Sequence, residues 1–171
     1  MKIIKETERL YLVEATTKDA AFMLALLNSE GWLKHIGDRN VRTESEAKQY
    51  LLDRVIKAYD EGFGMYNVII KSTEETIGMC GLVNRPTLEG IDIGFGFLAK
   101  YMGKGYAFES ATAVMSFAKN DLKLEKVLGI TTQENIRSQK LLEKLGLTIT
   151  KSYTDESDGS PMYLYEIIFS D

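Results

Sequence analysis

The sequence has few of the features that mark specialised classes of protein. Cys80 is the only cysteine in 171 residues, so no internal disulfide can form. No apolar run approaches the ~20 residues that a bilayer-spanning helix needs. Residues 1–10 are too polar for a secretory signal. These absences favour a cytoplasmic protein with no membrane partner.

The sequence also has little excess of one charge and few prolines. The formal net charge is −4, with no long run of one sign. Because binding to a phosphate backbone needs a basic face, this composition argues against nucleic acid as the main partner. Only two prolines occur, Pro86 and Pro161, and the chain has no repeat, low-complexity segment or linker. We therefore expect one domain that spans residues 1–171.

What the sequence does contain is a succession of strand and helix patterns. Alternating or continuous apolar residues predict strands at 8–15, 63–71, 76–84, 89–98, 126–132, 147–153 and 162–169. Apolar residues at helical spacing predict helices at 16–28, 43–61, 107–118 and 134–146. Thr43 and Glu46 have the spacing of a capping box at a helix start. Residues 32–42 are expected to be irregular.

This order of elements predicts an α/β fold of the mixed α+β kind. Antiparallel hairpins come first, and a β-α-β crossover joins strand 89–98 to strand 126–132. Such a crossover is right-handed and makes its two strands parallel. We therefore expect a central mixed, largely antiparallel β-sheet of about seven strands, with about four helices distributed over both of its faces.

The turn from strand to helix at 101–110 reads YMGKGYAFES and has a glycine on either side of Lys104. The first N–H groups of a helix have no partner within the helix, and together with the helix dipole they attract anions. Glycines let an anion approach the backbone closely. Met102 to Ala107 are thus expected to present N–H donors to a phosphate, to which Lys104 adds a point charge.

Other glycine-rich loops fit this turn less well. A P-loop needs its lysine after the second glycine, whereas Lys104 precedes Gly105. The dinucleotide fingerprint needs a third glycine at the position of Phe108. A tight strand-to-helix turn with no ligand also stays open as an interpretation.

Two blocks of the sequence resemble the GCN5-related N-acetyltransferases (GNAT), most closely their RimJ/RimL-type branch. Residues 102–107, MGKGYA, are similar to the family's pyrophosphate loop Q/R-x-x-G-x-G/A, with Met102 in place of the usual Gln or Arg. Asn135 and Ser138, followed by 142–147, resemble the segment NxxS…EKLGF. Further similar segments are 7–10 and 36–39. The resemblance covers nearly the whole chain.

The resemblance implies a GNAT fold in which strands 90–98 and 126–132 splay apart to admit acetyl-CoA. Gly94 and Gly96 would allow the splay, although glycines inside a strand also indicate a bulge. The pantetheine arm would pair with the first strand, because a strand edge offers unpaired N–H and C=O groups. The coenzyme would contact Phe95, Gly96, Phe97, Met102, Gly103, Lys104, Gly105, Tyr106, Ala107, Asn135, Ser138 and Lys144. Helix capping by Asn135 and a solvated Lys144 are the alternatives.

The implied reaction is direct attack of a neutral amine on the thioester, with coenzyme A as the product. The tyrosine and glutamate that transfer protons in better-known members are replaced here by Leu142 and Ile130, which cannot do so. Ser138 is the nearest replacement for the acid, and Asp92 is the expected base, acting through water. A solvated strand-edge carboxylate is the alternative for Asp92. Cys80 is expected to pack in the core.

The acceptor is expected to be an amine of low pKa, either a protein N-terminal α-amine or a small-molecule amine. At pH 7 roughly a tenth of an α-amino group is neutral, against a few in ten thousand lysine side chains. Candidates for the acceptor site are Trp32, His35, Asp38, Arg39 and Arg42. His35 is the only histidine, and a surface position is the alternative to a role as base. No metal site is predicted.

Two other function classes stay open. Leu142 and Ile130 are compatible with a non-catalytic domain that binds or senses acyl-CoA. A nucleotide-binding protein that does not use coenzyme A is the third hypothesis. The aromatic segment 162–169 fits a dimer interface as well as a core, so both a monomer and a homodimer are compatible with the sequence.

Overall fold

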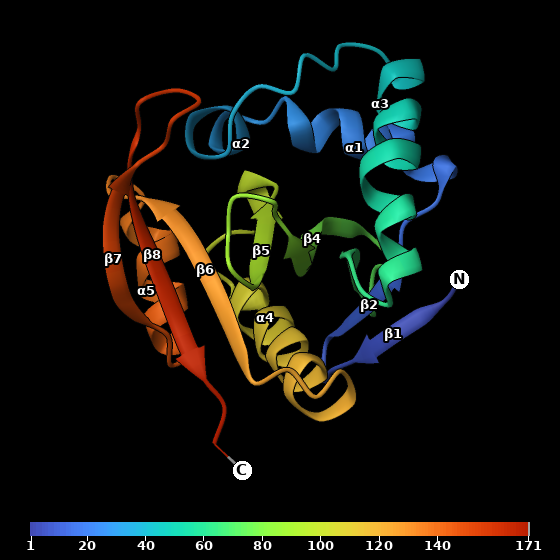
Figure 1. Cartoon of the computed structure of the whole chain (residues 1–171). Helices are drawn as coiled ribbons and strands as arrows, with labels where there is room; N and C mark the ends of the chain where they lie inside the picture. Colours follow the sequence, from blue (N-terminus) through green and yellow to red (C-terminus); the bar gives the residue numbers. More distant parts are fainter. Residues whose placement is uncertain (171) are drawn as a thin grey trace.

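The computed structural model describes residues 1–170, which form one curved eight-stranded sheet with helices packed on both faces (Figure 1). The strands are β1 (Ile3–Glu6), β2 (Leu10–Glu14), β3 (Met65–Ile70), β4 (Thr76–Asn84), β5 (Ile91–Phe97), β6 (Lys126–Thr132), β7 (Thr148–Thr154) and β8 (Pro161–Ile168). The main helices are α1 (Ala20–Leu27), α2 (Glu30–His35), α3 (Glu44–Tyr50), α4 (Tyr106–Ser116) and α5 (Ile136–Lys144). Further helical turns extend α3 to Glu61 and α4 to Asp121.

The predicted start of the second helix is confirmed. The Thr43 side chain accepts a hydrogen bond from the N–H of Glu46, and the Glu46 carboxylate accepts one from the N–H of Thr43. This reciprocal capping satisfies donors that the first helical turn leaves unpaired. The helix therefore begins where the local sequence requires it to.

Two elements were not predicted from the sequence. Residues 3–6 form β1, an edge strand whose outer residues are exposed, so its apolar pattern is weak. Residues 30–35 form α2, although residues 32–42 were expected to be irregular. A helix of six residues is too short to display a periodic apolar pattern, and Trp32 is its only buried residue.

The sheet has the order β1-β2-β3-β4-β5-β6-β8-β7, and β5 and β6 form its only parallel pair within residues 1–170. Their pairing is limited to one position, Asp92 opposite Leu128. In contrast, β6 pairs with β8 along its full length. Beyond Asp92 the two strands diverge, as Figure 1 shows. The expected splay between these strands is therefore confirmed.

Each face of the sheet has its own hydrophobic core. On one face α4 and α5 pack against the sheet, with Ala111, Val114 and Leu142 buried there. On the other face α1 and α3 pack around Met23 and Leu51. The two cores together fix the twisted sheet from both sides. Within residues 1–170, no helix has the length and apolar character needed to cross a bilayer.

Candidate active site

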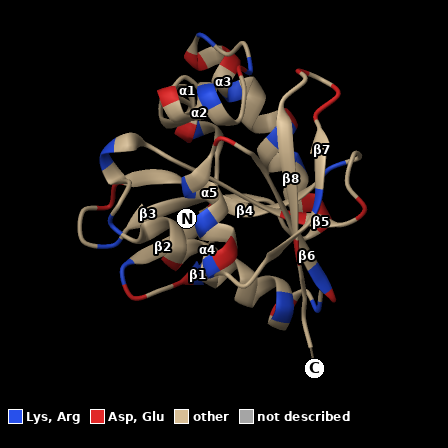
Figure 2. Ribbon diagram, turned by 90° about the vertical axis from the view of Figure 1, so that its left-hand side faces the viewer, with Lys and Arg blue, Asp and Glu red and all other residues tan. Residues whose placement is uncertain are grey.

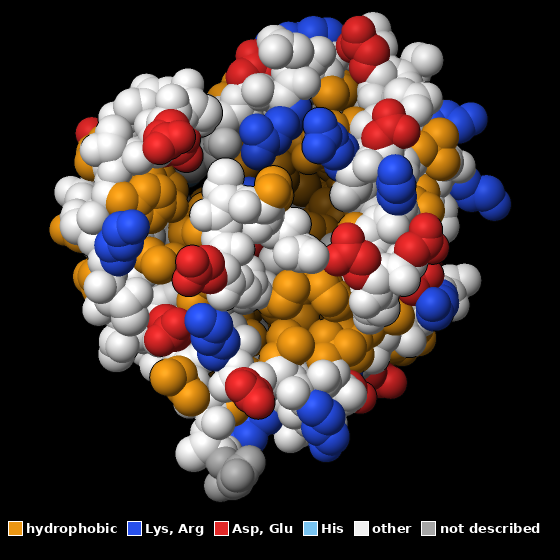
Figure 3. Space-filling model, viewed as in Figure 1, with side chains coloured by type: hydrophobic (Ala, Val, Ile, Leu, Met, Phe, Trp, Pro, Cys, Tyr) orange, Lys and Arg blue, Asp and Glu red, His pale blue; other side chains and the backbone are white. Residues whose placement is uncertain are grey.

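A deep cleft opens where β5 and β6 part, between α2 on one side and α5 on the other. In the space-filling view the cleft appears as a hollow with hydrophobic side chains on its floor (Figure 3). Lysine or arginine side chains stand on its upper rim in the same view. Elsewhere positive and negative side chains are interspersed over the elements (Figure 2).

The loop before α4 forms one end of the cleft. Gly103 and Gly105 have φ values of 76° and 82°, in the left-handed region that favours glycine. Within residues 1–170, the N–H groups of residues 103–108 donate no hydrogen bond to a protein acceptor. The loop therefore presents a run of free amide donors at a helix start, which is the arrangement that binds anions.

Basic side chains lie around this loop, and two of them, Arg137 and Arg9, were not predicted from the sequence. The Arg137 guanidinium on α5 lies 2.7 Å from the Met102 sulfur, and Arg9 donates a 3.1 Å hydrogen bond to the carbonyl of Lys104. The Lys104 side chain itself does not line the cleft. Lys144 also lies outside the lining and places its ammonium 4.0 Å from the centre of the Phe108 ring. Arg137 stands two residues after Asn135, a spacing that already placed it in the first turn of α5.

The edge of β5 that faces the gap carries the peptide groups of Phe95 and Phe97. The N–H of Leu98 donates to the carbonyl of Ile77 on β4, and the β4–β5 register is regular. Because successive peptide groups in a strand point to opposite sides, those of Gly96 face β4 while those of Phe95 and Phe97 face the gap. Of the three residues predicted to pair with an extended ligand, these two have the required orientation.

The glycines of β5 give room to two side chains of the cleft. The β4–β5 register runs without interruption, so the alternative interpretation of these glycines as a bulge is wrong. A Cβ at Gly96 would lie 2.8 Å from Cζ3 of Trp32, and a Cβ at Gly94 would lie 3.1 Å from the sulfur of Met65. The glycines thus allow these two side chains to lie directly on the strand and form the floor of the cleft.

Asp92 lies at the point where β5 and β6 still pair, and only 1% of its surface is exposed. Nε of Arg85 donates to both of its carboxylate oxygens, at 2.9 and 3.1 Å. Burial raises the pKa of this carboxyl, and the Arg85 charge opposes that rise. The interpretation of Asp92 as a solvated strand-edge carboxylate is therefore wrong. Arg85 sits in the turn after β4, where no sequence pattern linked it to Asp92.

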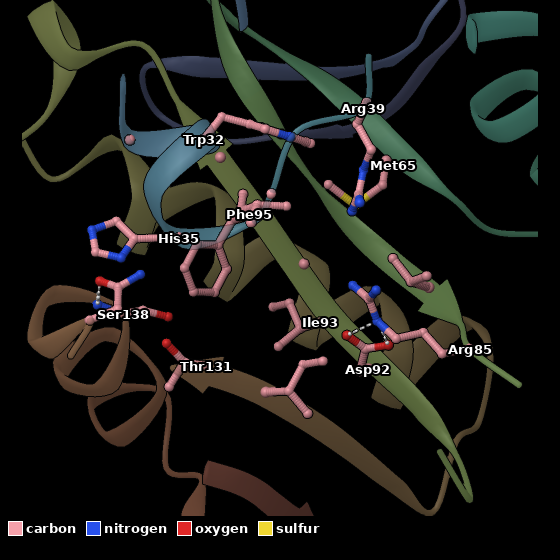
Figure 4. A pocket seen from close by; sticks show the side chains of 18 of the residues that line it. Trp32, His35, Arg39, Met65, Arg85, Asp92, Ile93, Phe95, Thr131 and Ser138 are labelled. Atoms are coloured by element: carbon pink, nitrogen blue, oxygen red, sulfur yellow. Dashed lines mark hydrogen bonds and ion pairs between the residues drawn. The ribbon is translucent and has the colours of Figure 1, made fainter. Parts of the chain in front are cut away.

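Asn135 caps α5 through its side-chain oxygen, which accepts a 3.1 Å hydrogen bond from the N–H of Ser138. Its side-chain NH₂ donates no hydrogen bond within residues 1–170, and Asn135 is among the residues that line the cleft. Ser138 is nine-tenths buried and also lines the cleft. Figure 4 shows Ser138, Thr131 and His35 gathered on one side of Phe95. Asn135 therefore has the capping role, and its NH₂ group is available to a ligand.

The residues predicted for the acceptor site divide into two groups. Trp32, His35 and Arg39 line the cleft. Asp38 and Arg42 do not, because they form an ion pair with each other on the outside of the loop. Partial burial and Lys34 lower the pKa of His35, while Glu134 opposes that shift.

The Cys80 side chain belongs to the hydrophobic core, as predicted, and is fully buried. Burial raises the pKa of its thiol to about 12, which leaves the thiolate unpopulated at neutral pH. Leu142 is also in the core, whereas Ile130 lines the cleft. Within residues 1–170, no three His, Cys, Asp or Glu side chains are grouped as a metal site would require.

Comparisons with known proteins give a consistent assignment. The family model of the acetyltransferase (GNAT) domain matches residues 9–148. The uncharacterized N-acetyltransferase YnaD of Bacillus subtilis is 26% identical over 141 residues, which cover 82% of this chain and 80% of that protein. The FsC-acetyl coenzyme A-N(2)-transacetylase of Aspergillus fumigatus is 27% identical over 166 residues, which cover 91% of this chain and 69% of that protein.

The fold has close counterparts among solved structures. A RimL ribosomal L7/L12 alpha-N-protein acetyltransferase in complex with coenzyme A superposes with a TM-score of 0.84. Its sequence is 17% identical to this one, and the match covers 98% of both chains. At this level of identity the likeness shows the common fold.

Proposed function

The chain belongs to the GNAT acetyltransferase family, and on that premise we propose that it transfers the acetyl group of acetyl-CoA directly to a primary amine. The observation that carries the proposal is the run of unpaired N–H groups at residues 103–108, placed at the end of the gap between β5 and β6. A diphosphate needs such donors, and an extended amide-bearing arm needs a free strand edge.

The coenzyme supplies the activated acetyl thioester, and the cleft supplies groups that match its parts. The amides of residues 103–107 would hold the diphosphate, with the Arg137 guanidinium adding positive charge beside them. The peptide groups of Phe95 and Phe97 would pair with the pantetheine amides. The free NH₂ of Asn135 is a further donor on the α5 side.

In the proposed chemistry the chain orients the reactants and assists two proton transfers. Holding the amine in line with the thioester carbonyl supplies an effective molarity of about 10⁵–10⁸ M. Backbone N–H groups near Phe95 would stabilise the developing oxyanion. Asp92 would accept the amine proton through a water molecule, and Ser138 would protonate the departing thiolate, each contributing about 10²–10⁴-fold. Asp92 would then release its proton to solvent, and Ser138 would regain one from solvent, so that both groups return to their starting state.

For the acceptor we propose an N-terminal α-amine or a small-molecule amine. The cleft offers a carboxylate paired with Arg85 as the base, and this favours an amine that is already partly neutral at pH 7. The RimL neighbour, named as an alpha-N-protein acetyltransferase, is a precedent for the protein version on the same fold. The proposal therefore includes a RimJ/RimL-type activity, which is acetylation of the N-terminal α-amine of a protein.

The test is thiol release from acetyl-CoA across a panel of amines at pH 7. We expect faster release with a peptide that has a free α-amine and no lysine than with an Nα-acetylated peptide that has one lysine. Equal rates on the two peptides would contradict the acceptor preference. Tight binding of acetyl-CoA in calorimetry, with no thiol release for any amine, would instead support the non-catalytic acyl-CoA-binding alternative.

A further inference from the structure

The segment from α2 to Arg39 crosses the cleft from the coenzyme end to the opposite end. A Cβ at Gly31 would lie 3.7 Å from Cε of Met102, in the loop before α4. One residue later, Trp32 lies on Gly96 in the middle of β5. The segment then reaches Arg39, whose side chain stands beside Met65, the first residue of β3 (Figure 4). Arg39 and the proposed phosphate loop therefore lie at opposite ends of this segment, and Trp32 on Gly96 lies between them.

The loop that carries Arg39 is fixed by its neighbours. Arg42 forms an ion pair with Asp38 and donates a 2.9 Å hydrogen bond to Oδ1 of Asn28. The Asn28 side chain in turn donates a 2.8 Å hydrogen bond to the carbonyl of Val41. The carboxylate of Asp38, the residue directly before Arg39, is therefore already paired with Arg42.

Arg39 forms no ion pair and no side-chain hydrogen bond within residues 1–170. Arg85, which also lines the cleft, is already neutralised by Asp92. The Asp155 carboxylate, which also lines the cleft, accepts hydrogen bonds from the N–H and hydroxyl of Ser157, at 2.8 and 2.6 Å. Arg39 is thus a cleft-lining cation with no carboxylate at ion-pair distance within residues 1–170.

A second unsatisfied donor lies on the same side. Nε1 of Trp32 is buried and has no hydrogen-bond partner, although Trp32 is 9% exposed and lines the cleft. In Figure 4 this nitrogen is on the part of the ring that extends toward Arg39. Buried donors without an acceptor are rare in folded proteins and call for a partner. The indole N–H and the Arg39 guanidinium are both hydrogen-bond donors that have no acceptor within residues 1–170. Either could donate to an anionic or carbonyl oxygen of a ligand.

We propose that the amine acceptor carries an anionic group, a carboxylate or a phosphate, close to its amine, and that Arg39 binds this group. The inference rests on the proposed acetyltransferase function and adds the chemical class of its acceptor. A planar guanidinium matches two oxygens of a carboxylate or phosphate at once. The amine of such an acceptor would then point along β5 from Gly94 toward Phe95, where the thioester is proposed to lie.

The test compares acceptor pairs that differ only in the anionic group. The probes are β-alanine against β-alanine amide, and 2-aminoethyl phosphate against ethanolamine. The C-terminally amidated peptide Ser-Asp-Ala-NH₂ against Ser-Asn-Ala-NH₂ extends the comparison to α-amines. For each pair, the ratio of kcat/KM values is measured in the wild type and in Arg39→Ala. Comparing the two ratios removes the differences in intrinsic amine reactivity within each pair.

We expect at least one anionic probe to be preferred, and Arg39→Ala to reduce that preference about 10- to 100-fold, mainly through KM. Arg39→Glu should reverse the preference, and Arg39→Lys should retain part of it. Arg54→Ala is the matched control. It removes the same charge from a residue that also lines the cleft and forms no ion pair within residues 1–170. The ratio should be unchanged in this control.

Whichever probe shows the effect identifies the anion as a carboxylate or a phosphate. An unchanged ratio in Arg39→Ala, with acetyl-CoA affinity equal to that of the wild type in calorimetry, would overturn the inference and leave the proposed function intact. A uniform loss on neutral and anionic probes alike would also overturn it. If no probe is acetylated by the wild type, the proposed function fails and the inference falls with it.

Discussion

Asp92 shows how a single residue can combine structural and chemical demands. It is buried at the last paired position between β5 and β6, where a lone carboxylate would be costly. Arg85 offsets that cost by donating to both oxygens. The pKa of Asp92 is nevertheless raised by burial, which brings the carboxyl closer to the range in which a general base works.

The first prediction concerns the pKa of Asp92. Because Arg85 lowers this pKa against the effect of burial, Arg85→Met should raise it further. A carboxyl whose folded pKa exceeds its unfolded pKa binds protons more tightly in the folded state. Its contribution to the free energy of unfolding is therefore greatest below the unfolded pKa and is lost as pH rises toward the folded pKa.

Carbon-13 NMR titration of the Asp92 carboxyl measures this directly. The wild-type pKa should lie above the usual aspartate range, and the Arg85→Met value should lie above the wild-type value. Arg54→Met, which removes an arginine that forms no ion pair with Asp92, should leave the titration unchanged. A lower Asp92 pKa in Arg85→Met would mean that Arg85 does not act electrostatically on this carboxyl.

At the scale of elements, the loop before α4 decides what the cleft can hold. Two left-handed glycines turn the chain so that its amides point outward, and Arg137 from α5 reaches the same loop. A helix start with unpaired amides attracts an anion only if no side chain blocks the approach. A Cβ at Gly103 would meet no heavy atom within 4 Å, so the space above the loop is open.

The second prediction compares two glycines that both have a left-handed backbone conformation. Gly103 and Gly62 have φ values of 76° and 87°, and a Cβ on either would meet nothing within 4 Å. Gly62 ends the helical segment after α3 and does not line the cleft. Each change to alanine should cost about 1–2 kcal/mol of stability from left-handed strain.

Only Gly103→Ala should also weaken coenzyme binding, by about tenfold or more, because its methyl group would stand where the diphosphate approaches the amides. Isothermal calorimetry with coenzyme A and thermal unfolding of both variants separate the two effects. Equal affinities for coenzyme A in Gly103→Ala and Gly62→Ala would show that the loop does not contact the diphosphate.

At the scale of the whole molecule, the gap between β5 and β6 leaves the sheet incomplete, and a ligand that lies in this gap can bridge the two strands. Six of the adjacent strand pairs are antiparallel, and the β5–β6 pair alone is joined at a single position. An extended arm lying between these strands would link the two halves of the sheet. Binding there should consequently stabilise the fold as a unit.

The third prediction is a thermal shift that is specific to the coenzyme. A ligand at 100 times its Kd adds about 2.7 kcal/mol to the free energy of unfolding. For a domain of this size that corresponds to a rise in Tm of about 5–10 °C. Acetyl-CoA should produce this rise, whereas ATP and NAD at the same concentration should not. A rise with ATP or NAD and none with acetyl-CoA would support the nucleotide-binding hypothesis instead.

Much of the fold could be predicted from the sequence because strand and helix patterns depend on neighbouring residues. The capping box at Thr43 and the glycines before α4 are local chemistry, and both are in the structure as expected. β1 and α2 escaped prediction because one lies at an exposed edge and the other has only six residues. Neither has the repeated apolar spacing that prediction depends on.

Apart from β1 and α2, the sequence by itself determined the order of the main strands and helices, the crossover that makes β5 and β6 parallel, and the free amides at the start of α4. Only the tertiary structure decided which side chains face the cleft. It joined Arg85 to Asp92, brought Arg137 to Met102, placed Trp32 on Gly96, and turned Asp38 and Arg42 away from the cleft while leaving Arg39 inside it. The physical reason is that these contacts depend on how elements cross in space, whereas a sequence pattern records only how residues repeat along one element.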